Sequence, residues 1–327
     1  MKTVETQKNG NFIKRLIAQP EVGVFIPFAI LFAVTALGNK NFLTMNNLTS
    51  VLRLLTCYAF CALGETLVIL GGDIDISVGQ TAGMGAMITS VLCCWNGMNI
   101  WIAVIISIII CAGFGLIKGF LVAKLNMFPY IATLSFIFIS KGIKFIITNG
   151  YSVYPFPPEA LAIAKLRPLG LKVSFYFMFV CFIIFEFLLR RTVFGRKIYA
   201  TGDNREVAKL AGINILKVRI TNYIICSVLC AIAGIWSTLE LSVGDPSLGE
   251  GWEMYAIAGS AIGGIALKGG KGSLIGTFIG VMFISLLNNT MVMFNVNSNY
   301  QIAITGVLLC GAVLIDMFRN SRRLKAA

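Results

Sequence analysis

The sequence predicts an all-α integral membrane protein with about ten transmembrane helices. Of its 327 residues, 57% are hydrophobic and only 13% are charged, and its mean hydropathy of +0.85 is far above that of soluble domains. Apolar runs of about 17–25 residues recur, and each is long enough to cross the hydrocarbon core as a helix. Runs such as "IWIAVIISIIICAGFGLI" lack the alternation of a membrane β-barrel, so we expect a helical bundle.

The whole chain, residues 1–327, is interpreted as one polytopic transmembrane domain. Residues 1–20 are polar and basic, and no small-residue cleavage site follows the first apolar segment, so we expect an uncleaved cytoplasmic lead-in. The apolar runs predict spans near 22–38, 51–70, 78–95, 101–123, 129–148, 173–189, 220–242, 254–267, 273–294 and 300–318.

Charge sets the predicted orientation of these spans. The stretch 190–219 carries eight Lys or Arg against Asp203 and Glu206, which places it in the cytoplasm under the positive-inside rule. Six spans precede it and four follow, so the lead-in and the basic tail 319–327 face the same side. The proline-rich connection 149–172 then lies outside.

Two glycine-rich breaks hint at an internal repeat. Each has a glycine pair followed by two glycines four residues apart: Gly71–Gly72 with Gly79 and Gly83, and Gly263–Gly264 with Gly272 and Gly276. Transporters are often built from repeated halves with such breaks, although a membrane protein with 33 glycines can produce the pattern by chance.

Several function classes are excluded by composition. The chain has no histidine, which rules out His-based triads and Cys/His zinc sites. Its nine cysteines lie in or beside apolar segments without C-x-x-C spacing and are interpreted as small hydrophobes, so no metal site is expected. The net charge of +13 lies in stretches flanking the spans, so no nucleic-acid partner is expected.

The basic glycine-rich segment 268–273 does not match a phosphate-binding loop. With Gly270 and Lys271 in register, Ile265 stands at the first glycine of the motif and Gly272 at its hydroxyl position. We therefore expect a tight cytoplasmic turn and no cofactor in this chain.

Two carboxylates, Asp73 and Asp75, stand between the second and third spans in "GGDIDISVGQ". A charge at the bilayer centre costs at least about 2.5 kcal/mol, so these groups require water, a partner or a helix end. Gly71–Gly72 can break one helix, and Asp75 or Ser77 can cap the next. Direct contact with a solute is the alternative, and the two roles are compatible because unwound backbone in a membrane protein commonly lines a cavity.

Other polar residues in the apolar regions suit an uncharged, hydroxyl-rich solute. Amides donate and accept hydrogen bonds, whereas an anion site is expected to show convergent Arg or Lys. The residues are Glu65, Glu250, Glu253, Asn288, Asn289, Asn299 and Gln301. For Asn288 and Asn289, hydrogen bonding between helices is the alternative.

The cytoplasmic stretch contains a predicted short helix, "REVAKLA". Asp203 or Asn204 is its candidate N-cap and Gly212 its stop. A short projecting helix with a small-residue face is suited to a groove on another protein, and a solvated connector is the alternative.

Several motifs together resemble one family. In order, "GGDIDISVG", "PYIATLSFIFISKGI", "GRKIYATGDNREVAKLAGINILKVR", "GWEMYAIAGSAIGGIALKGGKGSLIGTFIG" and "LLNNTMVMFNVNSNYQ" are similar to the membrane permeases of the ribose/xylose/galactose branch of bacterial ABC importers. The resemblance covers nearly the whole chain. Ile265, Lys268 and the "SKG" at 140–142 depart from the family pattern, which leaves the identity of the sugar open.

The resemblance implies a permease without enzymatic activity in the bacterial cytoplasmic membrane. Its partners would be a second permease copy, a cytoplasmic ATPase that binds ATP and magnesium, and an external solute-binding protein. The expected ATPase-coupling residues are Gly202, Asp203, Asn204, Glu206, Ala208, Ala211, Gly212 and Ile213. The expected translocation-path residues are Gly72, Asp73, Asp75, Ser77, Asn288 and Asn289.

A rival hypothesis from another class is an ion-coupled secondary transporter that uses Asp73, Asp75 or Glu65 as its ion site. A membrane enzyme would need an acid, base or metal constellation, and the sequence offers none that is convincing.

Overall fold

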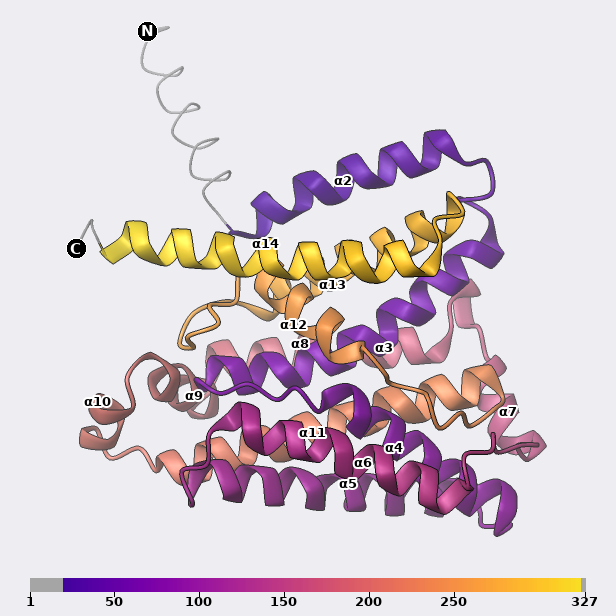
Figure 1. Ribbon diagram of the computed structural model, residues 1–327, viewed down its shortest axis with the longest axis horizontal. Coiled ribbons are helices and arrows are strands. Elements are labelled where there is room, and N and C mark those ends of the chain that lie inside the picture. Colours follow the sequence, from indigo (N-terminus) through magenta and orange to yellow (C-terminus); the bar gives the residue numbers. More distant parts are fainter. Residues whose placement is uncertain (1–19, 325–327) are drawn as a thin grey trace, which may run out of the picture.

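The protein is a bundle of long helices that lie roughly along one direction (Figure 1). The structure is a computed structural model and describes residues 20–324. Its α-helices are α2 Pro20–Gly38, α3 Met45–Leu70, α4 Val78–Ser90, α5 Ile100–Ala123, α6 Pro129–Thr148, α7 Pro158–Lys165, α8 Val173–Arg191, α9 Val193–Asp203, α10 Arg205–Leu210, α11 Ile215–Leu241, α12 Trp252–Ile262, α13 Leu274–Met293 and α14 Ser298–Leu324. A π-helical turn, Val91–Trp95, extends α4, and a 3-10 turn covers Pro168–Gly170.

Six helices in this part of the chain are long and apolar enough to cross a membrane: α3, α5, α6, α8, α11 and α13. The expected helical class is confirmed, but the expected count of about ten spans is not. The other four predicted spans fall on α2, α4, α12 and α14. Of these, α12 has 11 residues, too few to cross the roughly 30 Å hydrocarbon core alone. The α-helical part of α4 has 13 residues and is continued by the π-helical turn Val91–Trp95.

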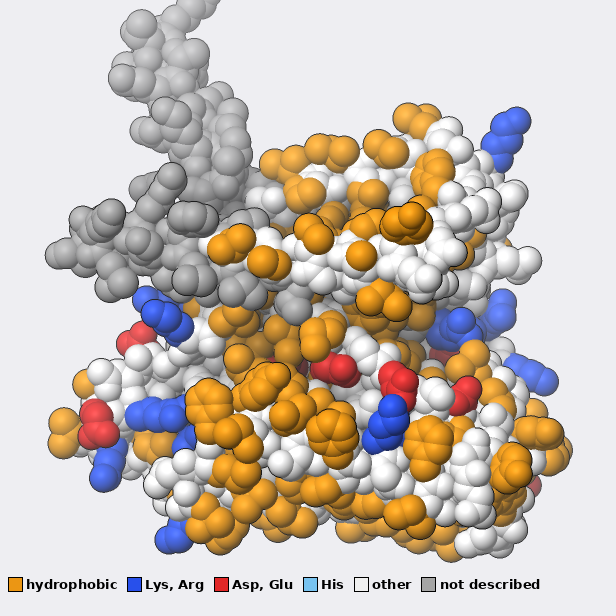
Figure 2. Space-filling view, viewed as in Figure 1, with side chains coloured by type: hydrophobic (Ala, Val, Ile, Leu, Met, Phe, Trp, Pro, Cys, Tyr) orange, Lys and Arg blue, Asp and Glu red, His pale blue; other side chains and the backbone are white. Residues whose placement is uncertain are grey.

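Packing separates central helices from lipid-facing ones. The apolar window of α3 is 83% buried, whereas those of α5 and α8 are only 28% and 22% buried. Helix α11 packs against α3, α4 and α5, and α13 packs against α2, α3 and α12. Hydrophobic side chains cover much of the visible surface (Figure 2), as expected where the solvent around a helix is lipid.

Both predicted glycine breaks end a helix with the same backbone geometry. After α3, Gly72 has φ +83° and the Asp73 amide donates to the Val68 carbonyl at 3.1 Å. After α12, Gly264 has φ +90° and the Ile265 amide donates to the Ser260 carbonyl at 3.0 Å. This is the Schellman pattern, which favours glycine at the left-handed position. It also ends α12 five residues before the predicted boundary at 267, because the chain there is already in a turn.

Two further boundaries differ from the sequence prediction. Helix α3 begins at Met45, six residues before the predicted span, and α14 continues to Leu324 through most of the predicted tail. The predicted lead-in, apart from Pro20, lies outside the described residues.

Candidate functional site: the loop between α3 and α4

The loop 71–77 connects α3 to α4 beside the end of the bundle that carries α9 and α10 (Figure 1). Both of its carboxylates are removed from solvent: Asp73 is 4% exposed and Asp75 is fully buried. Buried carboxylates are costly unless paired and hydrogen-bonded, and both are paired here.

Asp73 is held by two arginines from distant parts of the chain. Arg219 of α11 makes a bidentate pair, with Nε 2.7 Å from Oδ2 and Nη2 2.7 Å from Oδ1 of Asp73. Arg205 of α10 places Nη2 2.8 Å from the same Oδ1 and 2.7 Å from the Gly72 carbonyl oxygen. The Arg219 side chain is 7% exposed and that of Arg205 is 42% exposed. A single carboxylate thus connects the core helix α11 to the projecting helix α10.

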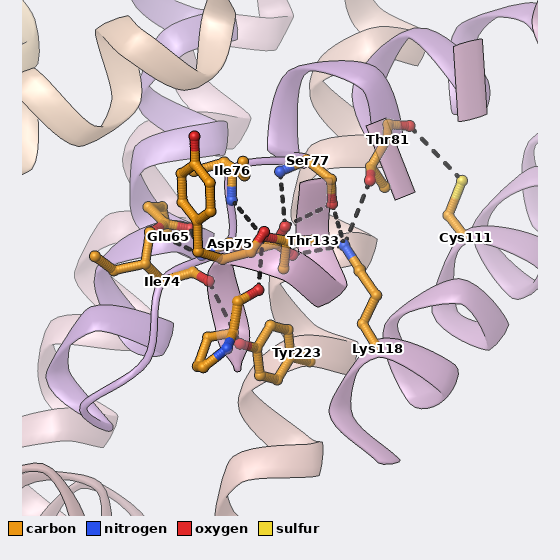
Figure 3. Close-up of polar contacts among 12 residues, drawn as sticks. Glu65, Ile74, Asp75, Ile76, Ser77, Thr81, Cys111, Lys118, Thr133 and Tyr223 are labelled. Carbon is orange, nitrogen blue, oxygen red and sulfur yellow. Dashed lines mark hydrogen bonds and ion pairs between the residues drawn. The ribbon is translucent and has the colours of Figure 1, made fainter. Parts of the chain in front are cut away.

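Asp75 belongs to a second network, centred on Lys118 of α5 (Figure 3). Lys118 Nζ lies 2.5 Å from Asp75 Oδ2 and 2.9 Å from Ser77 Oγ. Asp75 Oδ1 accepts from the Ser77 amide at 2.8 Å and from the Ser77 hydroxyl at 2.5 Å. The fully buried Glu65 accepts from the Asp75 amide, at 3.1 Å to Oε1.

The predicted capping of α4 is therefore wrong in its details. Ser77 occupies the N-cap position, but its side chain makes no cap hydrogen bond. Asp75 accepts from the amide of Ser77 itself, before the helix begins, and its other oxygen is taken by Lys118. The ammonium group competes successfully for the carboxylate because it compensates a full charge.

The end of α3, the end of α9 and the turn 268–273 lie in close contact beside this loop. A Cβ atom on Gly202 would lie 1.9 Å from the Leu70 carbonyl oxygen, and one on Gly269 would lie 2.8 Å from Gly72 Cα. The Gly270 amide donates to the Leu70 carbonyl at 3.0 Å. The segment 268–273 is the tight turn predicted from the sequence, and it also packs on the first glycine break.

The predicted short helix "REVAKLA" is confirmed as α10, Arg205–Leu210. Asn204 caps it by accepting from the Val207 amide at 3.1 Å, and Gly212 follows with φ +78°. Val207 and Leu210 on α10 are 60% and 87% exposed. These two aliphatic side chains offer an apolar surface on a projecting helix. Helix α9, Val193–Asp203, occupies most of the stretch before it.

The predicted coupling residues lie together in the chain around this helix. Gly202 and Asp203 end α9, and Asn204 begins the turn into α10. The other members follow within or directly after α10: Glu206, Ala208, Ala211, Gly212 and Ile213. Of these, Ala208 is buried, at 3% exposure.

The predicted path residues separate into two groups. Gly72, Asp73, Asp75 and Ser77 share the loop described above, whereas Asn288 and Asn289 lie on α13. Asn289 exchanges two amide hydrogen bonds with Asn47 of α3, of 2.7 and 3.1 Å. That pair matches the interhelical alternative for Asn289. Asn288 Nδ2 is buried and donates to none of the residues in 20–324.

Sequence reasoning missed the three cationic partners, Lys118, Arg205 and Arg219. Lys118 carried a usable signal, because a lysine inside a long apolar run needs a buried acid. Arg219 was assigned to the cytoplasmic stretch, but it lies in the first turns of α11 and is 6% exposed. Nothing local identified Arg205 as the partner of Asp73.

Similarity to known proteins agrees with this architecture. A family model described as branched-chain amino acid transport system / permease component matches residues 47–313. The ribose import permease of Escherichia coli strain K12 is 36% identical over 296 residues, which is 89% of this chain and 92% of that protein. The ribose import permease of Bacillus subtilis strain 168 is 33% identical over 327 residues, covering 98% and 100%. An L-arabinose ABC transporter permease of Azospirillum brasilense is 29% identical over 301 residues, covering 92% and 88%.

No solved structure matches the chain. The family model covers most of the sequence, and the relatives match it over nearly their full lengths. The resemblance drawn from the motifs is thereby confirmed, and the chain is a multi-pass membrane protein that belongs to the permease components of ABC importers, in the monosaccharide branch that includes the ribose and arabinose permeases.

Proposed function

We propose that this chain is the membrane subunit of an ATP-driven importer for a small neutral sugar. Two copies would form the translocation pathway in the bacterial inner membrane, with both chain termini in the cytoplasm. A cytoplasmic ATPase would bind ATP and magnesium, and an external binding protein would deliver the solute. The relatives named for ribose and arabinose support the sugar, whereas the family description also includes amino acid transport.

The observation that carries the coupling part of this proposal is the Arg205 contact. Arg205 stands at the start of α10 and binds both Gly72 O and Asp73, so a displacement of α10 acts directly on the loop that leads into α4. Leu210, 87% exposed on the same helix, supplies a surface for the ATPase. Closure of the ATPase pair would move α10, and the bundle would change the side on which its pathway opens.

The charges of the loop argue against the ion-coupled alternative. An exchangeable proton or sodium site needs a carboxylate that can release its partner during transport. Asp73 is already paired with Arg205 and Arg219, and Asp75 with Lys118. Glu65 has no cation at salt-bridge distance among the described residues, but the Asp75 amide donates to it.

A pull-down from native membranes tests the proposal. Tagged wild-type protein is solubilised in mild detergent and its partners are identified by mass spectrometry, alongside Leu210→Asp and Ala208→Pro. Burying a leucine contributes about 1.5–3 kcal/mol, so losing that contact lowers affinity by roughly 10- to 150-fold. We expect an ATPase with the wild type and little or none with either variant.

Leu169→Asp is the matched control, because Leu169 is 96% exposed in the turn Pro168–Gly170, near α7 rather than α10. It is expected to recover the ATPase at the wild-type level. The proposal fails if no ATPase accompanies the wild type and the purified protein alone accumulates solute when an ion gradient is imposed. Uptake of leucine, but not of ribose or arabinose, would contradict the proposal that the solute is a sugar.

A further inference from the structure

The segment between α11 and α12, residues 242–251, is not helical and runs along α4. Gly244 lies against Ser90 at one end of α4, and Gly249 lies against Gly79 near the other end. The contact therefore follows roughly 16 Å of the helix. The fit is tight: a Cβ atom on Gly83 would lie 2.1 Å from the Leu248 carbonyl oxygen. Irregular backbone within a membrane protein is tolerated where it is buried in protein or lines a water-filled cavity.

Four charged side chains surround this segment. Lys144 of α6 is fully buried and donates to the Leu248 carbonyl at 3.0 Å. Lys141 Nζ pairs with Glu250 Oε1 at 2.9 Å, with side chains 47% and 44% exposed. Glu253 stands in the first turn of α12. We name these four residues the charged cluster. Lys141, Glu250 and Glu253 act electrostatically on Lys144, as does Asp245 of the segment itself. In Figure 2, acidic and basic side chains lie together on the face between α14 and α6.

Buried groups at this place keep unused hydrogen-bonding capacity. Glu253 Oε2 is buried and accepts no hydrogen bond from residues 20–324. Lys144 can donate three hydrogen bonds, yet within the same residues only Leu248 accepts from it. Ser140 shares a face of α6 with Lys144, four residues away, and its buried hydroxyl is also unpartnered there. A buried polar group without a hydrogen-bond partner is unfavourable. A polar ligand that supplies the missing hydrogen bonds would therefore be stabilised here.

The loop 71–77 offers no comparable capacity. Both oxygens of Asp73 accept from arginine, and both oxygens of Asp75 accept from Lys118 or Ser77. These contacts connect structural elements to one another. Glu253 Oε2, in contrast, is a buried carboxylate oxygen without a hydrogen-bond partner among the described residues.

We infer that the charged cluster, with Glu253 and Lys144 at its centre, is the surface that contacts the solute during transport. The inference rests on the proposed function and names its site. A sugar hydroxyl donates to the Glu253 carboxylate and accepts from the Lys144 ammonium. Asp245 of the same segment also acts on Lys144, so acidic and basic groups are interspersed here and no cationic excess is present to hold an anion. Carboxylate acceptors beside ammonium donors match a hydroxyl-rich molecule.

The first test is uptake of radiolabelled D-ribose and L-arabinose by cells that contain the complete transporter. Glu253→Gln keeps the shape of the side chain but removes its charge, and we expect uptake kcat/KM to fall about tenfold or more. The ATPase should still be recovered with this variant in the pull-down, which separates a solute contact from misassembly. Glu159→Gln, the same change at an exposed position on α7, is the matched control and should transport normally. Normal uptake by Glu253→Gln would overturn the inference.

The second test measures solute contact without relying on transport rates. Glu250→Cys is treated with a water-soluble thiol reagent in native membranes that contain the full transporter. Cys310 is exposed whereas the other cysteines are buried or partly buried, so Cys310→Ser provides the background. We expect a transported solute to slow labelling at position 250 at least fivefold.

The outcomes separate the two proposals. Protection by ribose or arabinose supports both the sugar and the cluster. Protection by leucine alone contradicts a sugar as the solute, but it supports the charged cluster as the contact site. Labelling that ribose, arabinose and leucine all leave unchanged overturns the cluster, whether or not an ATPase is bound.

Discussion

The bidentate pair between Asp73 and Arg219 can be tested by a double-mutant cycle. The variants are Asp73→Asn, Arg219→Gln and the two combined. Both side chains are almost fully buried, at 2% and 7% exposure, and the atoms of the pair are 2.7 Å apart. Each single substitution leaves a buried charge without its main partner, whereas the double substitution removes both charges.

The expected magnitude follows from burial. Removing one partner of a buried ion pair costs about 3–5 kcal/mol. Taking about 2 °C per kcal/mol for a chain of this size, the apparent Tm should fall by roughly 6–10 °C in either single variant. The double variant should recover part of that loss, with a coupling energy on the order of 2 kcal/mol. Arg205→Ala should cost only about 0–1 kcal/mol, because that side chain is 42% exposed.

Unfolding can be followed in detergent with a thiol-reactive dye. Cys57, Cys61, Cys226 and Cys230 are buried, so they should react mainly when the bundle opens. Additive effects of the two single substitutions would refute the reasoning. If the Tm of Arg205→Ala falls as far as that of Arg219→Gln, the argument that the buried ion pair is stronger than the exposed one is contradicted.

Two further predictions use the same unfolding assay. Lys118→Met leaves the fully buried Asp75 without its cation and should cost about 3–5 kcal/mol; a Tm within 2 °C of the wild type would contradict the pairing. Gly202→Ala places a Cβ atom 1.9 Å from the Leu70 carbonyl oxygen and should lower the Tm by several degrees because backbone must move. Gly113→Ala is the control, because Gly113 is a helical position with nothing within 4 Å of the added Cβ atom. This variant should be neutral or up to about 1 kcal/mol more stable. An equal fall in Tm in both variants would show that the close approach does not matter.

Much of the architecture could be predicted because its signals are local. Hydropathy located ten of the thirteen α-helices of the described residues, glycine pairs marked both breaks, and Asn204 and Gly212 bounded α10. Each of these features depends on a few neighbouring residues, through side-chain caps, left-handed φ angles or the apolar length of a run.

The number of spanning helices could not be counted from apolar runs. Helix α12 stops at Ile262 and begins only after the irregular segment 242–251, whose course is fixed by its contact with Gly79 and Gly83 of α4. Hydropathy does not distinguish a helix from an extended apolar segment that is stabilised by such a contact.

The amino-acid sequence was enough to predict the helical membrane class, both glycine breaks and the carboxylates that needed partners. The identity of those partners depends on how distant parts of the chain pack together. Arg219 stands 146 residues from Asp73, and Lys118 stands 43 residues from Asp75, so no local pattern connects them. The same folding satisfies Asp73 and Asp75 and leaves Glu253 with a free oxygen, because hydrogen-bond capacity is a property of the assembled neighbourhood rather than of the residue.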